Sequence, residues 1–149
     1  MSIPTDQDTR RPEPAVEPRR PVLVVGTDDW AAEQAVVFLE EAGHETLTCH
    51  PLGEPAFPCN ALVEGRTCPL DVGFDVVVTV RARPLESPSP GELGAVCGLH
   101  AGASLVVAGM TRRNPFGRWA SVVVDGGDVV GSVEQALEDR DDAPQLGSV

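Results

Sequence analysis

The chain has 149 residues, which is enough for one domain with a buried core. Its net charge of −12 and isoelectric point near 4.5 exclude a general nucleic-acid binder, which needs a basic face, and disfavour anionic membrane surfaces. No apolar run approaches the roughly 20 residues that span a bilayer, so we expect no membrane segment.

The start of the chain lacks the apolar core of a secretion signal, so we expect a cytoplasmic protein. In that compartment, grouped cysteines indicate metal or redox chemistry more often than structural disulfides. The chain contains no lysine, because all 11 basic residues are arginine. This bias is typical of a GC-rich bacterial genome, and it excludes a Walker A loop or a Schiff-base lysine within this chain.

Composition divides the chain into one domain and two tails. Residues 1–20 are rich in Pro, Arg, Glu and Asp and predict a disordered N-terminal tail. Residues 141–149 predict a flexible C-terminal tail. We expect residues 21–140 to form a single α/β domain.

The first half of the domain predicts a strand, a helix and an edge strand. The apolar run Pro21–Gly26 is typical of a buried parallel strand. Asp28 or Asp29 can then cap a helix that runs to about Ala42. The alternating segment His44–Cys49 predicts an edge strand. We expect the inward face of the helix to consist of Ala31, Ala35, Phe38, Leu39 and Ala42.

A long Pro-rich and Gly-rich loop, His50–Gly73, separates this edge strand from the next buried strand, Asp75–Val80. Ser89–Glu92 then combines an N-cap serine, a proline at the first helical position and a capping-box glutamate. The helix that it opens is expected to run to about Ala101. Near one face this helix carries Leu93, Val96, Cys97 and His100.

The last part of the domain predicts two more buried strands, Leu105–Gly109 and Ser121–Val124, and a capping box, Ser132–Gln135, near or within the start of a final helix. This alternation indicates an α/β three-layer sandwich with a five-stranded parallel sheet in the order 2-1-3-4-5, and a long cysteine-containing loop between strands 2 and 3. The expected core residues of the sheet are Leu23, Val25, Val77, Val106 and Val123.

All four cysteines can converge on one site. Cys49 ends the second strand, Cys59 and Cys68 lie in the long loop, and Cys97 lies on the helix after the third strand. Four thiolates satisfy one tetrahedral zinc ion or one cubane iron–sulfur cluster. No C-x₂-C pair is present, so the prediction rests on the number and placement of the cysteines. The alternative ligands are His50 and His100.

A second candidate site is basic. Arg112, Arg113 and Arg118 form a local positive group in an acidic chain and can bind an anion or an acidic segment of a partner. The alternative is a solvated loop that Phe116 and Trp119 anchor to the core.

The stretch Val22–Val80 resembles the receiver domain of bacterial response regulators. VLVVGTDDW is similar to the receiver's first strand and acidic pair, which would be Asp28 and Asp29, and DVVVTVRARP is similar to its third strand. The resemblance implies a flavodoxin-like fold and a Mg²⁺ site at the acidic pair. However, the phosphoacceptor position falls on Val80, the hydroxyl position falls on Gly109, and the family's lysine is missing. We therefore expect no phosphoryl transfer, and we expect the aspartates to serve as helix caps.

These observations predict a small acidic regulatory or accessory protein, not an enzyme, with a Cys-ligated zinc or iron–sulfur centre. One alternative is a thiol/disulfide redox protein that uses Cys59 and Cys68. The other is a metal-free pseudo-receiver that serves as an interaction module. We expect a protein partner, and neither nucleic acid nor membrane.

Overall fold

A computed structural model describes residues 20–83, 85, 87–109, 113–125 and 128–142. Apart from Arg20, Asp141 and Asp142, the two predicted tails lie outside the described residues. The last helix continues to Asp142, past the predicted domain boundary at residue 140. Within the described residues, no helix has the length and apolar character that crossing a bilayer requires.

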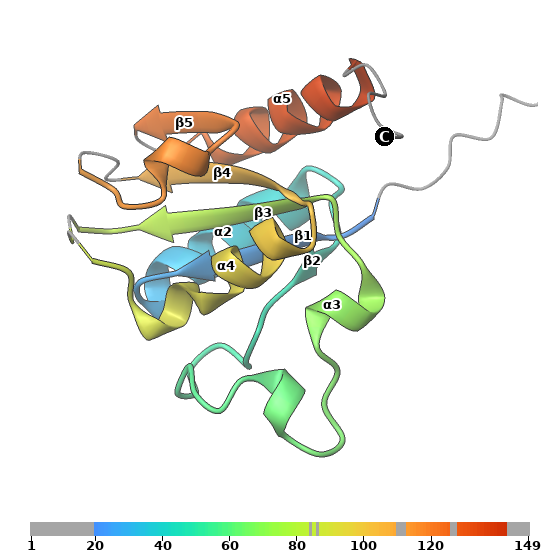
Figure 1. The fold of residues 1–149 in the computed structure, drawn as a ribbon, viewed down its shortest axis with the longest axis vertical. Helices are drawn as coiled ribbons and strands as arrows, with labels where there is room; N and C mark the ends of the chain where they lie inside the picture. The colour runs from blue at the N-terminus through green and yellow to red at the C-terminus, as the bar shows by residue number, and fades with distance from the viewer. Residues whose placement is uncertain (1–19, 84, 86, 110–112, 126–127, 143–149) are drawn as a thin grey trace, which may run out of the picture.

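The structure confirms the five-stranded, all-parallel sheet in the order β2-β1-β3-β4-β5 (Figure 1). The strands are β1 (Val22–Gly26), β2 (Thr46–Leu47), β3 (Val76–Arg81), β4 (Ser104–Gly109) and β5 (Val122–Asp125). The edge strand β2 pairs over two residues only, so it is shorter than the segment from which it was predicted.

Helices cover both faces of the sheet, which confirms the three-layer architecture (Figure 1). Helices α2 (Asp29–Glu41) and α5 (Val129–Asp142) pack on one face. Helix α4 (Leu93–His100) packs on the opposite face, against β1, β3 and β4. A one-turn helix, α3 (Pro69–Val72), lies in the cysteine-bearing connection.

Asp28 caps α2, as predicted: its carboxylate accepts a hydrogen bond from the Ala31 amide at 2.9 Å. The predicted inward face is only partly correct. Ala31, Ala35 and Leu39 are buried together with Ala32, whereas Phe38 is 47% exposed and Ala42 lies beyond the last helical residue. Successive residues turn by about 100°, and the buried stripe is centred between Ala35 and Leu39, so Phe38 falls outside it.

The central strands form the core, but β5 does not. Leu23, Val25, Val77 and Val106 are each no more than 3% exposed, as predicted. Val123 is 52% exposed, so its assignment to the core was wrong. Val123 pairs with Val107 in the register of the sheet, which places it on the α4 side, and α4 packs against the three central strands. β5 is therefore an edge strand with one uncovered face.

Helix α5 starts ahead of Ser132–Gln135, which was predicted to lie near or within its start. The Asp128 carboxylate accepts from the Gly131 amide at 2.9 Å, and the Ser132 hydroxyl donates to the Asp128 carbonyl at 2.7 Å. The helix therefore begins at Val129, and the sequence Ser132–Gln135 lies inside it rather than at its cap.

The connection from β2 to β3 lacks the long crossover helix that usually joins two parallel strands. In an alternating parallel fold, a crossover helix is expected here on the α4 side of the sheet, over β1. The chain instead carries a 3₁₀ turn, Asn60–Leu62, and the short helix α3, and Phe74 then packs with the α4-side core. The long connection expected over His50–Gly73 therefore contains two short helical turns. We call residues 49–73 the cysteine segment; Figure 1 shows that it extends from the β2 edge of the sheet.

A buried ion pair between Arg81 and Glu92 lies at the end of β3. The Arg81 guanidinium donates to both carboxylate oxygens of Glu92, at 2.9 and 2.7 Å, and both side chains are fully buried. Arg81 also donates to the backbone carbonyls of Leu85 and Ser87. The pair therefore joins β3, the following loop and the start of α4.

Glu92 has further donors. The Thr79 hydroxyl donates to it at 2.7 Å, and the Ser89 amide donates at 3.1 Å, which completes the predicted capping box. Burial by itself opposes the charged carboxylate. The hydrogen bonds from Arg81, Thr79 and Ser89 outweigh that effect and hold the pKa of Glu92 below its usual value.

Candidate functional site

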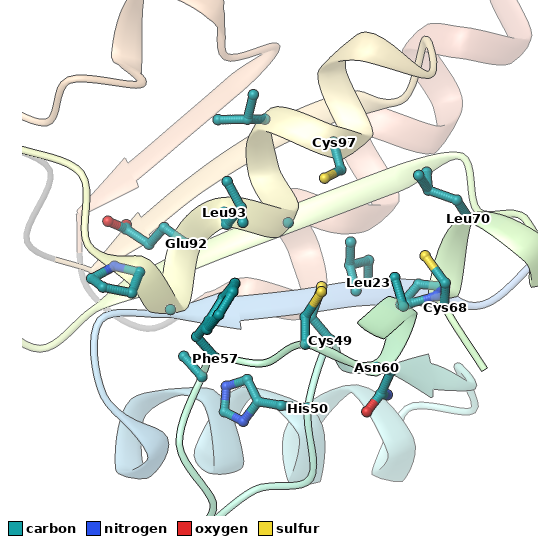
Figure 2. A pocket seen from close by; sticks show the side chains of 18 of the residues that line it. Leu23, Cys49, His50, Phe57, Asn60, Cys68, Leu70, Glu92, Leu93 and Cys97 are labelled. Atoms are coloured by element: carbon teal, nitrogen blue, oxygen red, sulfur yellow. The ribbon is translucent and has the colours of Figure 1, made fainter. Parts of the chain in front are cut away.

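All four cysteines line one cavity, which lies between the cysteine segment and α4 and has a volume of about 240 Å³. Leu23 of β1 and the buried Phe74 contribute apolar walls, and Leu93 and Val96 of α4 line another side. Figure 2 shows the sulfur atoms of Cys49 and Cys68, from the cysteine segment, and of Cys97, from α4, turned toward a common space. The cavity therefore occupies the position of the missing crossover helix.

Each cysteine lies at or next to an element boundary, or on a helix. Cys49 follows β2, Cys59 precedes the 3₁₀ turn, Cys68 precedes α3, and Cys97 lies on α4. All four are half-buried, and none is in a disulfide. The sequence placed these four residues near one edge of the sheet, and the structure brings them together.

Small residues on α4 let the helix approach the cysteine segment closely. A Cβ atom on Gly94 would lie 2.6 Å from Cys49 Sγ and 2.8 Å from Val25 Cγ1. A Cβ atom on Gly98 would lie 2.9 Å from Val77 Cγ1. Neither position has room for a larger residue unless its neighbours move. The absence of a side chain at Gly94 therefore brings Cys49 against the helix that carries Cys97.

Two polar side chains tie the cysteine segment to the domain. The Asn60 amide group donates to the Thr48 carbonyl at 3.3 Å, and the Asn60 backbone N–H donates to the Cys49 carbonyl at 2.7 Å. The Asp29 carboxylate accepts from the Gly53 amide at 2.8 Å. Asn60 therefore holds the 3₁₀ turn beside the end of β2, next to two of the cysteines.

This arrangement also accounts for the acidic pair. Asp28 caps α2 and Asp29 holds the cysteine segment at Gly53. Both carboxylates accept backbone hydrogen bonds, so the structure assigns them structural roles. The capping role of Asp28 is confirmed, and the tether from Asp29 had no signal in the sequence.

The surroundings of Cys49 and Cys97 disfavour the charged forms of these two thiols. Burial raises the pKa of the Cys49 thiol to about 12, and the negative charges of Cys97, Cys59 and Cys68 as thiolates contribute in the same direction. Burial also raises the pKa of Cys97, again with contributions from Cys68 and Cys59.

The cavity wall offers little that would stabilise a thiolate. None of the described lining residues is a lysine or an arginine. Apart from the cysteines, the titratable lining residues are His50 and Glu92. The Glu92 carboxylate already accepts hydrogen bonds from Arg81, Thr79 and Ser89.

The four thiols line the cavity. Within the described residues, no group of three or more His, Cys, Asp or Glu side chains is positioned to hold a single metal ion. The ligand role of Cys49, Cys59, Cys68 and Cys97 therefore stays a prediction. Of the alternative ligands, His50 lines the cavity, whereas His100 is exposed at the end of α4 and does not line it.

The structure describes the second candidate site only in part. Arg112 lies outside the described residues. The Arg118 guanidinium stacks over the Trp119 ring, 5.0 Å from its centroid. Phe116 is 3% exposed and anchors the loop, as the alternative interpretation predicted, but Trp119 is 55% exposed and does not. Anion or partner binding by Arg112, Arg113 and Arg118 stays a prediction.

Comparison of the chain with protein-family models, with curated proteins and with solved structures finds no match.

Proposed function

We propose that the cavity holds a metal centre ligated by Cys49, Cys59, Cys68 and Cys97, and that the chain is a cytoplasmic regulatory or accessory protein that works through this centre. One observation carries the proposal: every cysteine of the chain lines the same cavity, although three lie far apart along the cysteine segment and the fourth lies on α4. If the cysteines served only as small apolar core residues, we would expect them to be spread over the core rather than gathered at one cavity. Zinc and iron–sulfur clusters are the groups that four thiolates bind.

A metal cation also supplies what the cavity wall lacks. The thiolate is the form that binds metal and the form that attacks disulfides, and a neighbouring positive charge stabilises it. Since no lysine or arginine is among the described lining residues, a metal ion would be the source of that charge. The same observation weakens the alternative of metal-free disulfide exchange between Cys59 and Cys68.

The cavity does not favour an enzyme. General acid–base catalysis needs a titratable side chain that is free to exchange a proton with a substrate. Glu92 already accepts from the buried guanidinium of Arg81, and His50 Nδ1 lies 3.0 Å from the Pro51 carbonyl oxygen. We therefore propose that the centre regulates or stabilises the protein for a protein partner, on a receiver-like scaffold that does not transfer phosphoryl groups.

We expect the full chain, purified without oxygen and without chelators, to contain bound metal, and we expect Cys68→Ala to lose most of it. Cys68 is one of four equivalent ligands in this account, so removing its sulfur opens the coordination sphere. Elemental analysis per mole of chain measures the effect.

Thr67→Ala is the matched control, because Thr67 is the exposed neighbour of Cys68 and does not line the cavity. Equal metal content in Cys68→Ala and the unmodified chain would contradict the proposal. A metal-free chain with a reversible Cys59–Cys68 disulfide would instead support the redox alternative, and a metal-free chain with four inert thiols would support the interaction module.

A further inference from the structure

We propose that the bound group is a cubane iron–sulfur cluster of four iron and four sulfide ions, rather than a single zinc ion. This inference rests on the proposed function, and it is carried by the space between the thiols. Around one zinc ion with Zn–S bonds of about 2.3 Å, four sulfur atoms lie within roughly 4 Å of one another and leave no cavity between them. Around a cubane cluster, the ligand sulfur atoms lie roughly 6–7 Å apart, because the cluster itself fills the centre.

The structure has the space that the second arrangement needs. The four thiols lie on the walls of a cavity of about 240 Å³, and the described side chains form no close group of three potential ligands. A cluster that brings its own sulfide and iron ions into this space can reach all four walls. A single ion can do so only if the walls collapse onto it.

Two of the walls resist that collapse. Cys97 lies on α4, and the position of α4 is fixed by contact of its glycines with the sheet and by the buried Arg81–Glu92 pair at its start. Cys49 lies against Gly94, and its carbonyl accepts from Asn60. The sheet and helix therefore hold these two thiols at a set separation, and the other two come from the cysteine segment.

The rest of the wall suits a cluster. Leu23, Phe74, Leu93 and Val96 line the cavity with apolar groups, and a hydrophobic surrounding limits the access of water to a metal site. Pro69 follows Cys68 directly, and a Cys-Pro pair also ends the bacterial ferredoxin ligand run.

Assembly balances without a further reactant. Two ferrous ions, two ferric ions and four sulfide ions combine with the four thiols, and the four thiol protons are released as the iron–thiolate bonds form. The resulting cluster, with its thiolates, carries two negative charges.

The test loads the full metal-free chain in two ways under strict exclusion of oxygen. In one arm the chain receives ferrous and ferric iron with sodium sulfide, and in the other it receives zinc alone. We expect the first arm to yield four iron and four sulfide ions per chain and a broad visible absorption band, which Cys97→Ala should lose. Thr67→Ala, an exposed residue that does not line the cavity, is the control and should load like the unmodified chain.

Each other outcome overturns a defined part of the account. If the chain takes up one zinc ion on four thiolates and no iron or sulfide, the cluster inference is wrong and the proposed metal centre stands. If it takes up neither, both are wrong. If loading survives Cys97→Ala, the four-cysteine ligand set is wrong, and a loss in His100→Ala would then identify the alternative ligand.

Discussion

Replacing Glu92 with Gln is expected to lower the free energy of unfolding by about 3 kcal/mol or more, because the change leaves the guanidinium of Arg81 buried without its counter-charge. The pair is fully buried and bidentate, and Glu92 accepts from Thr79 and Ser89 as well. Chemical denaturation, followed by far-ultraviolet circular dichroism, measures the loss.

Glu33→Gln is the matched control, since Glu33 lies on the exposed side of α2. Its expected effect is within about 0.5 kcal/mol. The double variant Arg81→Met with Glu92→Gln should cost less than the sum of the two single changes, because each single change alone leaves one buried polar group without its main partner. Additive losses would show that the two side chains do not act as a pair.

The Arg81–Glu92 pair also makes the free energy of unfolding depend on pH. The pKa of Glu92 is lower in the folded chain than its ordinary value of 4.5, so folding favours the carboxylate. Its contribution is fully present above that ordinary value and is lost as the pH falls through the lower folded-state pKa. The loss in Glu92→Gln should therefore be largest near neutral pH and should shrink when both proteins are compared in acid below the ordinary carboxyl range.

Replacing Gly94 with Ala is expected to abolish metal loading while the sheet persists. The added Cβ would lie 2.6 Å from Cys49 Sγ, which is closer than real Cβ contacts, so the sulfur or the helix must move. Overpacking of this kind typically costs about 1–3 kcal/mol, which a folded α/β domain can tolerate. Metal content per chain and circular dichroism, measured on the same sample, separate the two effects.

Gly98→Ala is the sharper of two controls. Gly98 lies on the same helix as Gly94, and a Cβ atom there would lie 2.9 Å from Val77 Cγ1 of β3. The change therefore has a similar packing cost but does not touch a cysteine. Gly117→Ala, where a Cβ atom meets nothing within 4 Å, should change neither property. If Gly94→Ala and Gly98→Ala reduce metal content equally, the loss reflects general strain in α4 and not the position of Cys49.

The sequence predicted the strands best where both faces of the strand are buried. β1, β3 and β4 are covered on both faces, so their runs of valine and leucine carry a strong signal. The same kind of run, Ser121–Val124, misled the core assignment of Val123. An apolar run does not reveal whether a helix covers both of its faces, because that depends on where the neighbouring connections pack.

The sequence predicted which residues gather at the site but not the shape of the cavity between them. The ends of parallel strands meet at one edge, so the order of elements was enough to predict that Cys49 and Cys97 approach one another. The cavity itself depends on contacts between distant residues, such as Gly94 with Cys49 and Asp29 with Gly53. The capping box Ser89–Glu92 is local and was predicted, whereas the partner of Glu92, Arg81, lies eleven residues away and was not.

Protection of the thiols in the metal-loaded chain tests the central claim most directly. The loaded protein is treated with iodoacetamide under native, oxygen-free conditions, and the adducts are counted by intact-protein mass spectrometry. A second sample is first stripped of metal and unfolded, so that all four cysteines of the chain can react. The account predicts no adducts in the loaded protein and four in the stripped protein, because every thiol is a ligand of the same centre. A loaded protein in which Cys49, Cys59, Cys68 or Cys97 reacts as readily as in the stripped sample would contradict it.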